Sequence, residues 1–547
     1  MNKLLKIFAA AAIALSMVAC SSANKMAQQA SKIIVECNPT VLEVIGGSID
    51  AYVTITYPAN YFNPKAILEV TPVIVYDGGE KAGSVLTYQG EKVKDNFKVV
   101  PSKGGTVSER IRIPYAEGME QCYLELRGVA TVKVKSANLP AKKIADGANT
   151  TYMLVKKDGF ISLKADGYQE IIKETEEGQI LYAVNSSVVR SNQLNSQSIK
   201  EFQAALDEIK ANERKTLTGT EVVAYASPEG GQQRNARLSD DRSKTAEKAW
   251  NSVTKGHEAA APDVKSIGQD WEGFRELVEK SNIEDKDLIL RVLSMYSDPA
   301  VRESEIRNMS EIFKELKGGV LPELRRARFI ANVEFKNYTS EELVKLIEDN
   351  IDILDESALL HAATLLDDTN KILNIYHKAV DKFDSDRARF NIGVTYLASG
   401  DIAKAEAAFK KLDSKDGDVQ NALGVIALRK NDIQTASRYF SAAGTEDANK
   451  NMGIIDILTG NYSKAATELA NVSGCPHNTV LAYILTGQLD KALSKATCKD
   501  PKVYYLKAVI AARKGDSTGV KENLAYACKN ADLAARAKKD VEFAAFN

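Results

Sequence analysis

The sequence predicts a multidomain chain with an N-terminal β-sandwich, a central α/β domain that carries a helical insertion, and a C-terminal α-solenoid. Three observations support this prediction. Apolar and polar side chains alternate in several stretches of residues 32–155, which is the period of half-buried strands. From residue 178 the patterns follow the order strand, helix, strand, helix, as in a βαβ unit. From residue 340 the chain is alanine-rich and repeats a helical pattern.

Composition excludes several classes of protein. The 547 residues include 72 Lys and Arg against 73 Asp and Glu, so the net charge of −1 gives no overall electrostatic reason to bind nucleic acid. A hydrophobic fraction of 44% is too high for a disordered chain. Histidines are few, and Walker, Gly-x-Ser-x-Gly, His-Glu-x-x-His and paired Cys-x-x-Cys motifs are missing, so we expect no cofactor, no metal site and no enzyme. An active site built from scattered carboxylates stays open as an alternative.

The N-terminus has the anatomy of a secretory signal. Lys3 and Lys6 give the first residues a positive charge, and an apolar stretch over residues 7–15 follows them. Small or apolar residues then lead to Cys20. The stretch is too short to cross a bilayer, because a spanning helix needs about 20 apolar residues. We expect residues 1–19 to be removed and residues 20–31 to form a tether.

The ending Val18-Ala19-Cys20 resembles the lipobox of bacterial lipoproteins, with Met17 where that family usually has leucine. The resemblance implies that Cys20 is acylated, with palmitate among the acyl chains, and that these chains attach the protein to the outer membrane. Neither an aspartate nor an acidic cluster follows Cys20. This favours the periplasmic face of the outer membrane, with surface display and an ordinary cleavable signal as alternatives.

The N-terminal β part follows a two-residue period. Apolar and polar residues alternate over 49–56, 110–113 and 122–126, and Asp77-Gly78-Gly79 indicates a turn. Short strands at this spacing favour an antiparallel sandwich over residues 32–155. No polar cluster in it implies chemistry, so we expect a spacer or an interaction module.

Five cysteines remain besides Cys20, in a compartment that permits disulfides. Cys37 and Cys122 lie in the same predicted β part and could pair. Cys475, Cys498 and Cys528 lie on predicted helices. We interpret these three as packed thiols, because free cysteine is often buried as a small hydrophobe.

The central part alternates strands and helices. Residues 180–184 and 222–225 predict strands, the second of which runs into a loop marked by proline and glycines at 226–231. A second helix is expected from about Leu238 to Val253. The first helix is predicted by apolar residues at intervals of three or four, namely Ile199, Phe202, Leu206 and Ile209.

Residues 225–250 resemble the signature of the OmpA-like peptidoglycan-binding domain. That family has a strand ending in Gly-His-Thr-Asp, a glycine turn, and then Asn-x-x-Leu-Ser-x-x-Arg opening a helix. The corresponding residues here are Ala224-Tyr225-Ala226-Ser227, Gly230, Asn235, Leu238, Ser239 and Arg242. The resemblance implies that the family aspartate and arginine hold the ammonium and carboxylate of diaminopimelate in the peptidoglycan stem peptide.

Ser227 stands where the family has its aspartate, and Glu229, two residues on, could supply the missing charge. The peptidoglycan-binding residues that the resemblance implies are therefore Ser227, Glu229, Asn235 and Arg242. The alternative is an α/β domain in which Asn235 and Arg242 only cap and brace a helix.

The end of this domain is also similar to the family. Apolar side chains alternate over 329–335 after the paired arginines Arg325 and Arg326, as in the strand that completes the family's sheet. The residues between the second helix and this strand read as helices. We expect one OmpA-like domain over residues 178–338 with an enlarged helical insertion.

Residues 340–547 contain internal repeats. Gly393, Gly424 and Gly453 follow one another at steps of 31 and 29 residues, each with an alanine and a bulky apolar residue at similar distances behind it. The pattern resembles the tetratricopeptide repeat, whose period is 34 residues. The resemblance implies stacked helix pairs that usually bind peptides or proteins on their concave face, so we expect an unidentified protein partner.

The leading interpretation is a non-enzymatic, lipid-anchored envelope protein that links the outer membrane to the cell wall and to a protein partner. One alternative is an envelope assembly scaffold with a degenerate OmpA-like domain that no longer binds peptidoglycan, and Ser227 favours it. The other is a surface-exposed accessory lipoprotein for nutrient or host-protein capture. The lack of an acidic stretch after Cys20 counts against that one.

Overall fold

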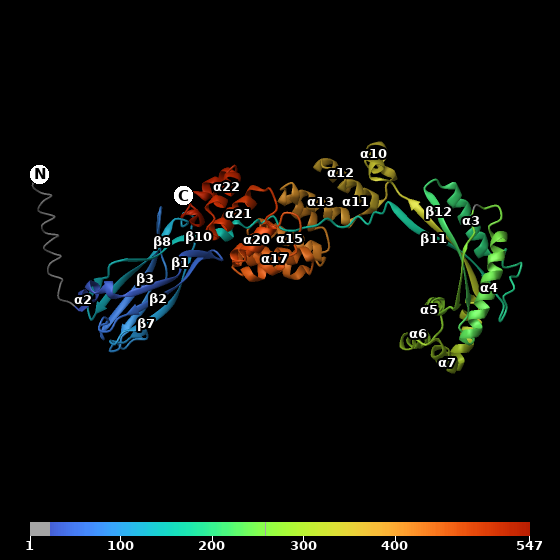
Figure 1. Cartoon of the computed structure of the whole chain (residues 1–547), viewed down its shortest axis with the longest axis horizontal. Coiled ribbons are helices and arrows are strands. Elements are labelled where there is room, and N and C mark those ends of the chain that lie inside the picture. Colours follow the sequence, from blue (N-terminus) through green and yellow to red (C-terminus); the bar gives the residue numbers. More distant parts are fainter. Residues whose placement is uncertain (1–21, 258, 547) are drawn as a thin grey trace, which may run out of the picture. The chain divides into compact units, whose positions relative to one another are not determined.

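The computed structural model describes residues 22–257 and 259–546 (Figure 1). The expected signal and Cys20 therefore lie outside the described residues. The chain divides into two compact units. Unit 1 combines the residues up to Lys164 with those from Asp386 onward, and unit 2 comprises Ala165–Ser385. Over the ranges 22–257 and 259–546, no helix has both the length and the apolar character needed to cross a membrane.

The N-terminal part of unit 1 is a β-rich region with the strand order β6-β5-β3-β8-β10-β1-β2-β7, with β4 beside β3 and β9 beside β8. Most neighbours are antiparallel, but β1 with β10 and β5 with β6 run parallel, which corrects the purely antiparallel prediction. Strand β10 can lie parallel to β1 because a long stretch of chain connects the two strands. The strands are β1 (Ile34–Ile45), β2 (Ser48–Tyr57), β3 (Ala66–Tyr76), β4 (Gly79–Ala82), β5 (Leu86–Gly90), β6 (Lys98–Val100), β7 (Gly105–Pro114), β8 (Cys122–Val132), β9 (Lys135–Asn138) and β10 (Lys142–Asn149).

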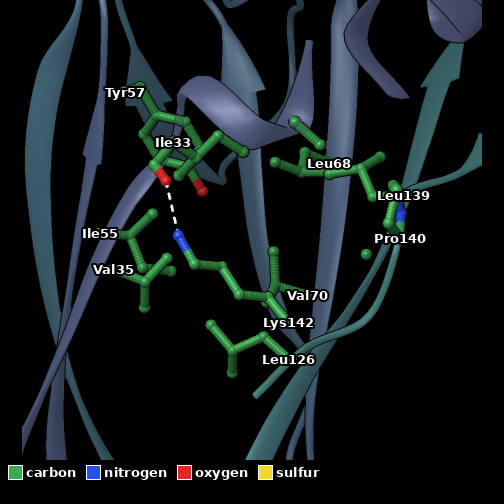
Figure 2. A pocket seen from close by; sticks show the side chains of 12 residues that line it. Ile33, Val35, Ile55, Tyr57, Leu68, Val70, Leu126, Leu139, Pro140 and Lys142 are labelled. Atoms are coloured by element: carbon green, nitrogen blue, oxygen red, sulfur yellow. Dashed lines mark hydrogen bonds between the residues drawn. The ribbon is translucent and has the colours of Figure 1, made fainter. Parts of the chain in front are cut away.

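Part of the expected tether is a helix that packs on this region. Helix α2 (Ser22–Gln28) contacts β8 and β9 and buries Ala23 and Met26. A short 3-10 turn, η1 (Ala30–Lys32), leads into β1. Lys142 of β10 donates a hydrogen bond from Nζ to the carbonyl oxygen of Ile33 at 2.8 Å, beside a small cavity of about 50 Å³ (Figure 2). The first described residues are therefore anchored on the β-rich region.

The C-terminal part of unit 1 consists of successive helix pairs. Each odd-numbered helix from α13 to α21 contacts the helix that follows it. The helices are α13 (Asp386–Ala398), α14 (Ile402–Phe409), α15 (Gly417–Arg429), α16 (Ile433–Ala443), α17 (Glu446–Thr459), α18 (Tyr462–Glu468), α19 (His477–Leu485), α20 (Leu489–Lys495), α21 (Pro501–Arg513), α22 (Ser517–Ala527) and α23 (Ala531–Ala537), followed by the 3-10 turn η4 (Val541–Phe543).

Glycines let the two helices of a pair approach closely. A Cβ atom added to Gly393 would lie 2.5 Å from the ring of Phe409, and one added to Gly424 would lie 2.5 Å from the ring of Phe440. The aromatic ring of the second helix thus fills the space that the glycine leaves on the first. This small-against-large packing at the repeat spacing confirms the prediction of tetratricopeptide-type repeats.

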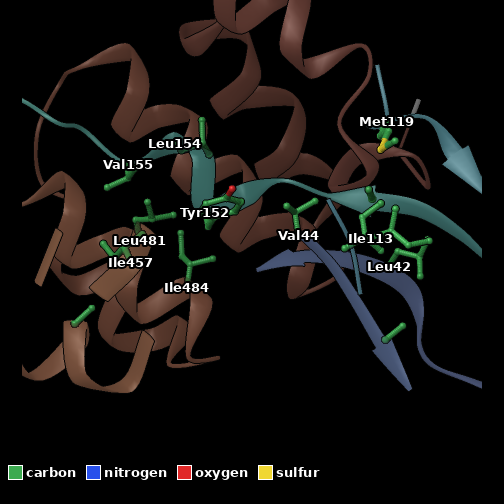
Figure 3. Close-up of a cluster of buried hydrophobic side chains, with 14 of the residues drawn as sticks. Leu42, Val44, Ile113, Met119, Tyr152, Leu154, Val155, Ile457, Leu481 and Ile484 are labelled. Atoms are coloured by element: carbon green, nitrogen blue, oxygen red, sulfur yellow. The ribbon is translucent and has the colours of Figure 1, made fainter. Parts of the chain in front are cut away.

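The two parts of unit 1 share one hydrophobic core. Side chains from the β-rich region, from the segment after β10 and from helices α17 and α19 belong to the same cluster (Figure 3). Residues 150–155 join the two parts, because they follow the last strand and then pack on the helices. The labelled members are Leu42, Val44, Ile113, Met119, Tyr152, Leu154, Val155, Ile457, Leu481 and Ile484.

Unit 2 contains a four-stranded sheet in the order β11-β14-β12-β13. Strand β14 (Arg326–Lys336) is antiparallel to β11 (Ile171–Leu181) and to β12 (Lys215–Ala226). Strand β13 (Asp263–Gln269) runs parallel to β12 at the edge. Helices α3 (Gln197–Ala211) and α4 (Gln232–Val253) pack on the sheet through a core in which the rings of Phe202, Trp250 and Phe329 are close neighbours.

The helical insertion of unit 2 has its own small core, which includes Phe274, Leu293 and Leu316. It consists of α5 (Trp271–Lys280), α6 (Lys286–Met295), α7 (Pro299–Asn308), α8 (Ser310–Gly318) and α9 (Val320–Glu323). After β14 come α10 (Ser340–Asp349), η3 (Ile351–Ile353), α11 (Glu356–Thr364) and α12 (Thr369–Phe383).

Three predicted elements of unit 2 are corrected. The region predicted as wholly helical contains strand β13, whose residues are mostly exposed and so lack an apolar period. Helix α4 begins at Gln232, before the predicted start at Leu238, because its first turns are polar. Strand β11 spans Ile171–Leu181 and not the predicted 180–184. Its first residues escaped prediction because half-buried polar side chains hide the alternation.

The prediction of packed thiols is wrong for two cysteines. Cys475 and Cys498 form a disulfide with a Cα–Cα distance of 5.6 Å. Cys475 lies before α19 and Cys498 after α20, so the two ends of one helix pair are brought together by the repeat itself. Cys37 and Cys122 are both free and buried, and Cys528 is free and half-buried.

Candidate functional site

The four residues predicted to bind peptidoglycan line one cavity of about 370 Å³ in unit 2. Strand β12 ends at Ala226, and the loop that follows carries Ser227 and Glu229. Helix α4 then carries Asn235 in its first turn and Arg242 two turns further on. The strand–loop–helix order therefore brings these side chains to one end of the sheet.

Arg242 is held by the domain's own backbone. Its side chain is 0% exposed, its Nε donates to the carbonyl of Ser186 at 3.0 Å, and its Nη1 donates to that of Tyr225 at 2.8 Å. A third, longer bond of 3.4 Å reaches the carbonyl of Ala183, and the guanidinium lies 5.0 Å from the ring centroid of Tyr182. Burial lowers the pKa of Arg242 to about 10, which still leaves it charged near neutral pH. Its first role in this geometry is to brace the fold.

The other predicted residues are also hydrogen-bonded to their neighbours. Asn235 donates from Nδ2 to the carbonyls of Ser227 at 3.0 Å and of Gly230 at 2.6 Å, which fixes the loop. The hydroxyl of Ser227 donates to Glu229 at 3.0 Å. Glu229 forms an ion pair of 2.7 Å with Arg325 at the start of β14. The carboxylate at this site is thus already neutralised by an arginine of the same unit.

The insertion adds cations that sequence reasoning missed. Arg307, Phe313 and Lys317 line the same cavity from α7 and α8, and Arg234 lines it from α4. Lys317 lies 4.9 Å from the ring centroid of Phe313. Arg234 makes no ion pair with any residue in the described ranges. The sequence shows basic residues in the predicted helical insertion, but their position along the chain does not indicate that they line the cavity.

The second site is the face of the repeats formed by the first helix of each pair, which holds a segment of the same chain. We call residues 155–164 the strap; it has neither helix nor strand structure and appears as the thin teal thread beside α15 and α13 in Figure 1. Asn451 accepts from the amide of Phe160 at 2.7 Å and donates to its carbonyl at 2.8 Å. Asn421 also donates to the carbonyl of Phe160, at 3.0 Å.

The same two-bond grip recurs at both ends of the strap. Asn391 accepts from the amide of Lys164 at 2.8 Å and donates to its carbonyl at 3.3 Å. Asn478 accepts from the amide of Lys156 at 2.8 Å and donates to its carbonyl at 2.8 Å. Asparagine amides thus hold every fourth residue of the strap by its backbone, a contact that does not depend on side-chain identity.

Side chains add selectivity to this grip. Lys156 pairs with Asp500 at 2.5 Å, and Lys164 pairs with Asp416 at 3.0 Å and with Asp418. Burial would raise the pKa of Asp500 and of Asp416, but hydrogen bonds from the neighbouring ammonium groups and from backbone N–H groups outweigh it and lower both pKa values. The two ends of the strap are therefore fixed by charge as well as by backbone hydrogen bonds.

Backbone shape matters at the centre of the strap. Gly159 has φ of +77°, and a Cβ atom there would lie 2.8 Å from the side chain of Val425. Arg429 donates to the carbonyl of Asp158 at 2.8 Å, and Ser162 donates to Asp447 at 2.7 Å. A glycine is therefore required before Phe160, both for the conformation and for the space.

A buried histidine contacts the backbone just before the strap, near the β-rich region. The Nε2–H of His477 donates to the carbonyl of Leu154 at 2.7 Å, and the side chain is 3% exposed. Burial lowers the pKa of His477 to about 4. Its Nδ1 finds no hydrogen-bond partner among residues 22–257 and 259–546.

The asparagines were missed by sequence reasoning, although a signal was present. Asn391, Asn421 and Asn451 recur at steps of 30 residues, just before the repeat glycines, and each is almost fully buried. A buried polar residue that recurs on an otherwise apolar helix face needs a partner, and the strap supplies it. The described residues contain no group of His, Cys, Asp and Glu able to hold a metal ion.

No family model matches this chain, and no curated protein matches it. Among solved structures, a tetratricopeptide repeat protein from Parabacteroides merdae is 12% identical with a TM-score of 0.29, and the match covers 37% of this chain and 90% of that one. YrrB, described as a TPR protein with an unusual peptide-binding site, is 19% identical with a TM-score of 0.21, over 37% of this chain and all of its own. Yeast Tom70 is 14% identical with a TM-score of 0.25, over 62% and 69%. At TM-scores this low, the assignment of the repeats rests on their helix pairs and glycine–phenylalanine contacts.

Proposed function

We propose that this protein is a non-enzymatic lipoprotein of the cell envelope, held on the periplasmic face of the outer membrane by acyl chains on Cys20. In this proposal the β-rich region is a sandwich that acts as a spacer, and the repeats provide protein contact. Unit 2 is an OmpA-like domain whose cavity binds a carboxylate-bearing peptide of the cell wall.

The excess of positive charge around the cavity is the observation that supports wall binding. Arg234, Arg307, Lys317 and Arg325 line it, in addition to the buried Arg242, against the single carboxylate of Glu229. Lys317 is exposed, so its charge can reach a ligand in the cavity, whereas Arg307 is exposed but pairs with Glu303 and donates to the carbonyl of Glu229 at 3.3 Å. A stem peptide offers carboxylates at fixed separations, and charge-assisted hydrogen bonds to them would set its orientation.

One observation favours the scaffold alternative. The arginine that matches the family motif donates to backbone carbonyls, and Glu229 is paired with Arg325. The two charges that would hold a zwitterion are thus engaged within the domain. A domain that kept the fold and lost the ligand would have this arrangement.

Calorimetry with a purified stem tripeptide that contains diaminopimelate separates the two functions. We expect binding by the parent protein, and a loss of about tenfold for Lys317→Gln or Arg307→Gln, because hydrogen bonds to charged groups contribute roughly 1.5–3 kcal/mol when well formed. Lys314→Gln on the same helix α8 is the matched control, since Lys314 is exposed and does not line the cavity. No binding by the parent or by Ser227→Asp, with both proteins folded, would leave the scaffold function.

The anchor is tested separately. Cys20→Ser should release the protein from membranes into the soluble periplasmic fraction, because the acyl chains are the proposed attachment. A variant that still floats with membranes at high salt would contradict the lipoprotein proposal.

A further inference from the structure

The face of α13, α15, α17 and α19 that holds the strap, here called the groove, has the features of a peptide-binding site. Four asparagines, on α13, α15, α17 and α19, present amides that hold backbone N–H and C=O groups. Each of the four is at most 8% exposed. This burial holds with the strap in place, and Asn451 also donates to Asn421 at 2.8 Å. The amides are thus satisfied by the strap together with a neighbouring asparagine, and a peptide that replaced the strap would have to make the same backbone hydrogen bonds.

The charges beside the groove define what fits it. Acidic side chains stand at both ends, Asp500 at one and Asp416 with Asp418 at the other. The occupant must carry basic residues eight positions apart, as Lys156 and Lys164 do. It also needs a glycine three positions after the first lysine, where Val425 leaves no room for a Cβ atom.

We propose that the groove is a binding site for extended peptides with the pattern Lys-x-x-Gly-x-x-x-x-Lys, and that the strap is its resident inhibitor. The partner is a protein that carries such a basic segment and gains access only when the strap is displaced. This inference rests on the proposed role of the repeats in protein contact. It does not depend on the cavity of unit 2.

Competition sets the size of the effect. A segment tethered in cis has an effective concentration in the millimolar range, so the strap excludes a free peptide with the same contacts at micromolar concentration. Weakening the strap without touching the groove should open the site. Lys156→Glu with Lys164→Glu does this, because it places like charges opposite Asp500 and Asp416.

The test is fluorescence anisotropy with a labelled synthetic peptide of residues 151–168 and the full chain. We expect no saturable binding by the wild type up to about 100 µM peptide, and at least a tenfold gain for the double variant. Lys94→Glu with Lys103→Glu, two exposed lysines of unit 1, is the control for the change of charge. A peptide that carries the two glutamates should not bind the double variant.

Two results would overturn the inference. One is a double variant that melts like the wild type and does not bind the peptide. The other is a wild type that binds it as tightly as the variant. Should the double variant fail to fold, hydrogen exchange of the wild type decides: peptide at several millimolar should speed exchange of the Phe160 amide, and unchanged exchange would refute displacement. Stem-peptide calorimetry on the same samples shows whether the cavity proposal stands or fails independently.

Discussion

The groove of unit 1 and the cavity of unit 2 both contain buried polar side chains, yet the chain uses them differently. In the groove, Asn451 and its counterparts hold a segment that is remote in sequence. In the cavity, Arg242 holds a carbonyl of strand β12, and Asn235 holds one of the loop that follows this strand. Only in the first arrangement do the bonded groups belong to a segment that is remote in sequence. Burial of a polar residue therefore indicates that it has a partner, and the partner's connectivity decides whether a ligand could replace it.

The largest effect is expected when Arg242, whose side chain holds backbone carbonyls of unit 2, is replaced. Arg242→Ala should destabilise unit 2 by roughly 5 kcal/mol, because it leaves backbone carbonyls unsatisfied and a cavity where a buried side chain stood. Arg237→Ala, an exposed change on the same helix, should alter the free energy of unfolding by less than about 0.5 kcal/mol. Scanning calorimetry of Arg242→Ala should show a lower melting temperature for unit 2 and an unchanged one for unit 1. A folded unit 2 with only weaker peptide binding would make Arg242 a ligand group.

The matching change in unit 1 removes the central asparagine. Asn451→Ala leaves the amide and carbonyl of Phe160 without one partner, so we expect a loss of roughly 4 kcal/mol in unit 1. Asn449→Ala is the control, since Asn449 is exposed on the same helix α17. Urea unfolding followed by hydrogen exchange would assign the loss to one unit. Equal stability of the two variants would show that the strap contributes little to unit 1.

A pH dependence separates the units further. The pKa of His477 is lowered to about 4 in the folded protein, against about 6.5 in an unfolded chain. Protons therefore bind the unfolded state first, so the stability is complete above pH 6.5 and falls by roughly 3 kcal/mol as the pH drops to 4. His477→Gln keeps an N–H donor and does not titrate. Thermal melts between pH 7.5 and 4.5 should converge for the two proteins if the histidine carries the effect.

The smallest expected effect concerns repeat packing alone. Gly424→Ala places a Cβ atom 2.5 Å from the ring of Phe440, and overpacking of this kind costs roughly 2 kcal/mol. Gly231→Ala in unit 2 has open space and should change little. A melting temperature of Gly424→Ala equal to that of the wild type would mean that the paired helices can separate freely.

Sequence patterns predicted the elements whose apolar faces are regular. Strand β2 buries every second residue from Ile49 to Tyr57, and α3 buries Ile199, Phe202, Leu206 and Ile209 as expected. Strand β13 and the first turns of α4 escaped prediction, because edge strands and exposed helix starts bury few apolar side chains.

The sites were predictable to different degrees. The sequence resemblance predicted that Ser227, Glu229, Asn235 and Arg242 lie together, and they line one cavity. Their hydrogen-bond partners could not be predicted, because these depend on tertiary contacts with Arg325 and with backbone carbonyls. The strap has no hydrophobic period of its own, so local sequence reasoning passes over it. The disulfide was missed for a similar reason, since two cysteines of one helix pair become neighbours only after the helices pack.

The strap runs against the order of the repeats, and this direction affects how the chain can fold. Its first residues bind late helices and its last residues bind early ones: Lys156 bonds to Asn478, whereas Lys164 bonds to Asn391. Farther out, Asn149 and Thr151 bond to Glu542, which lies 393 and 391 positions away. Unit 2 is one continuous stretch of chain and can fold as soon as residue 385 is available. The strap stays unpaired until the residues around Asp500 have emerged, and Asn149 and Thr151 stay unpaired until Glu542 has emerged. Completion of unit 1 is therefore expected to be the last and slowest step of folding.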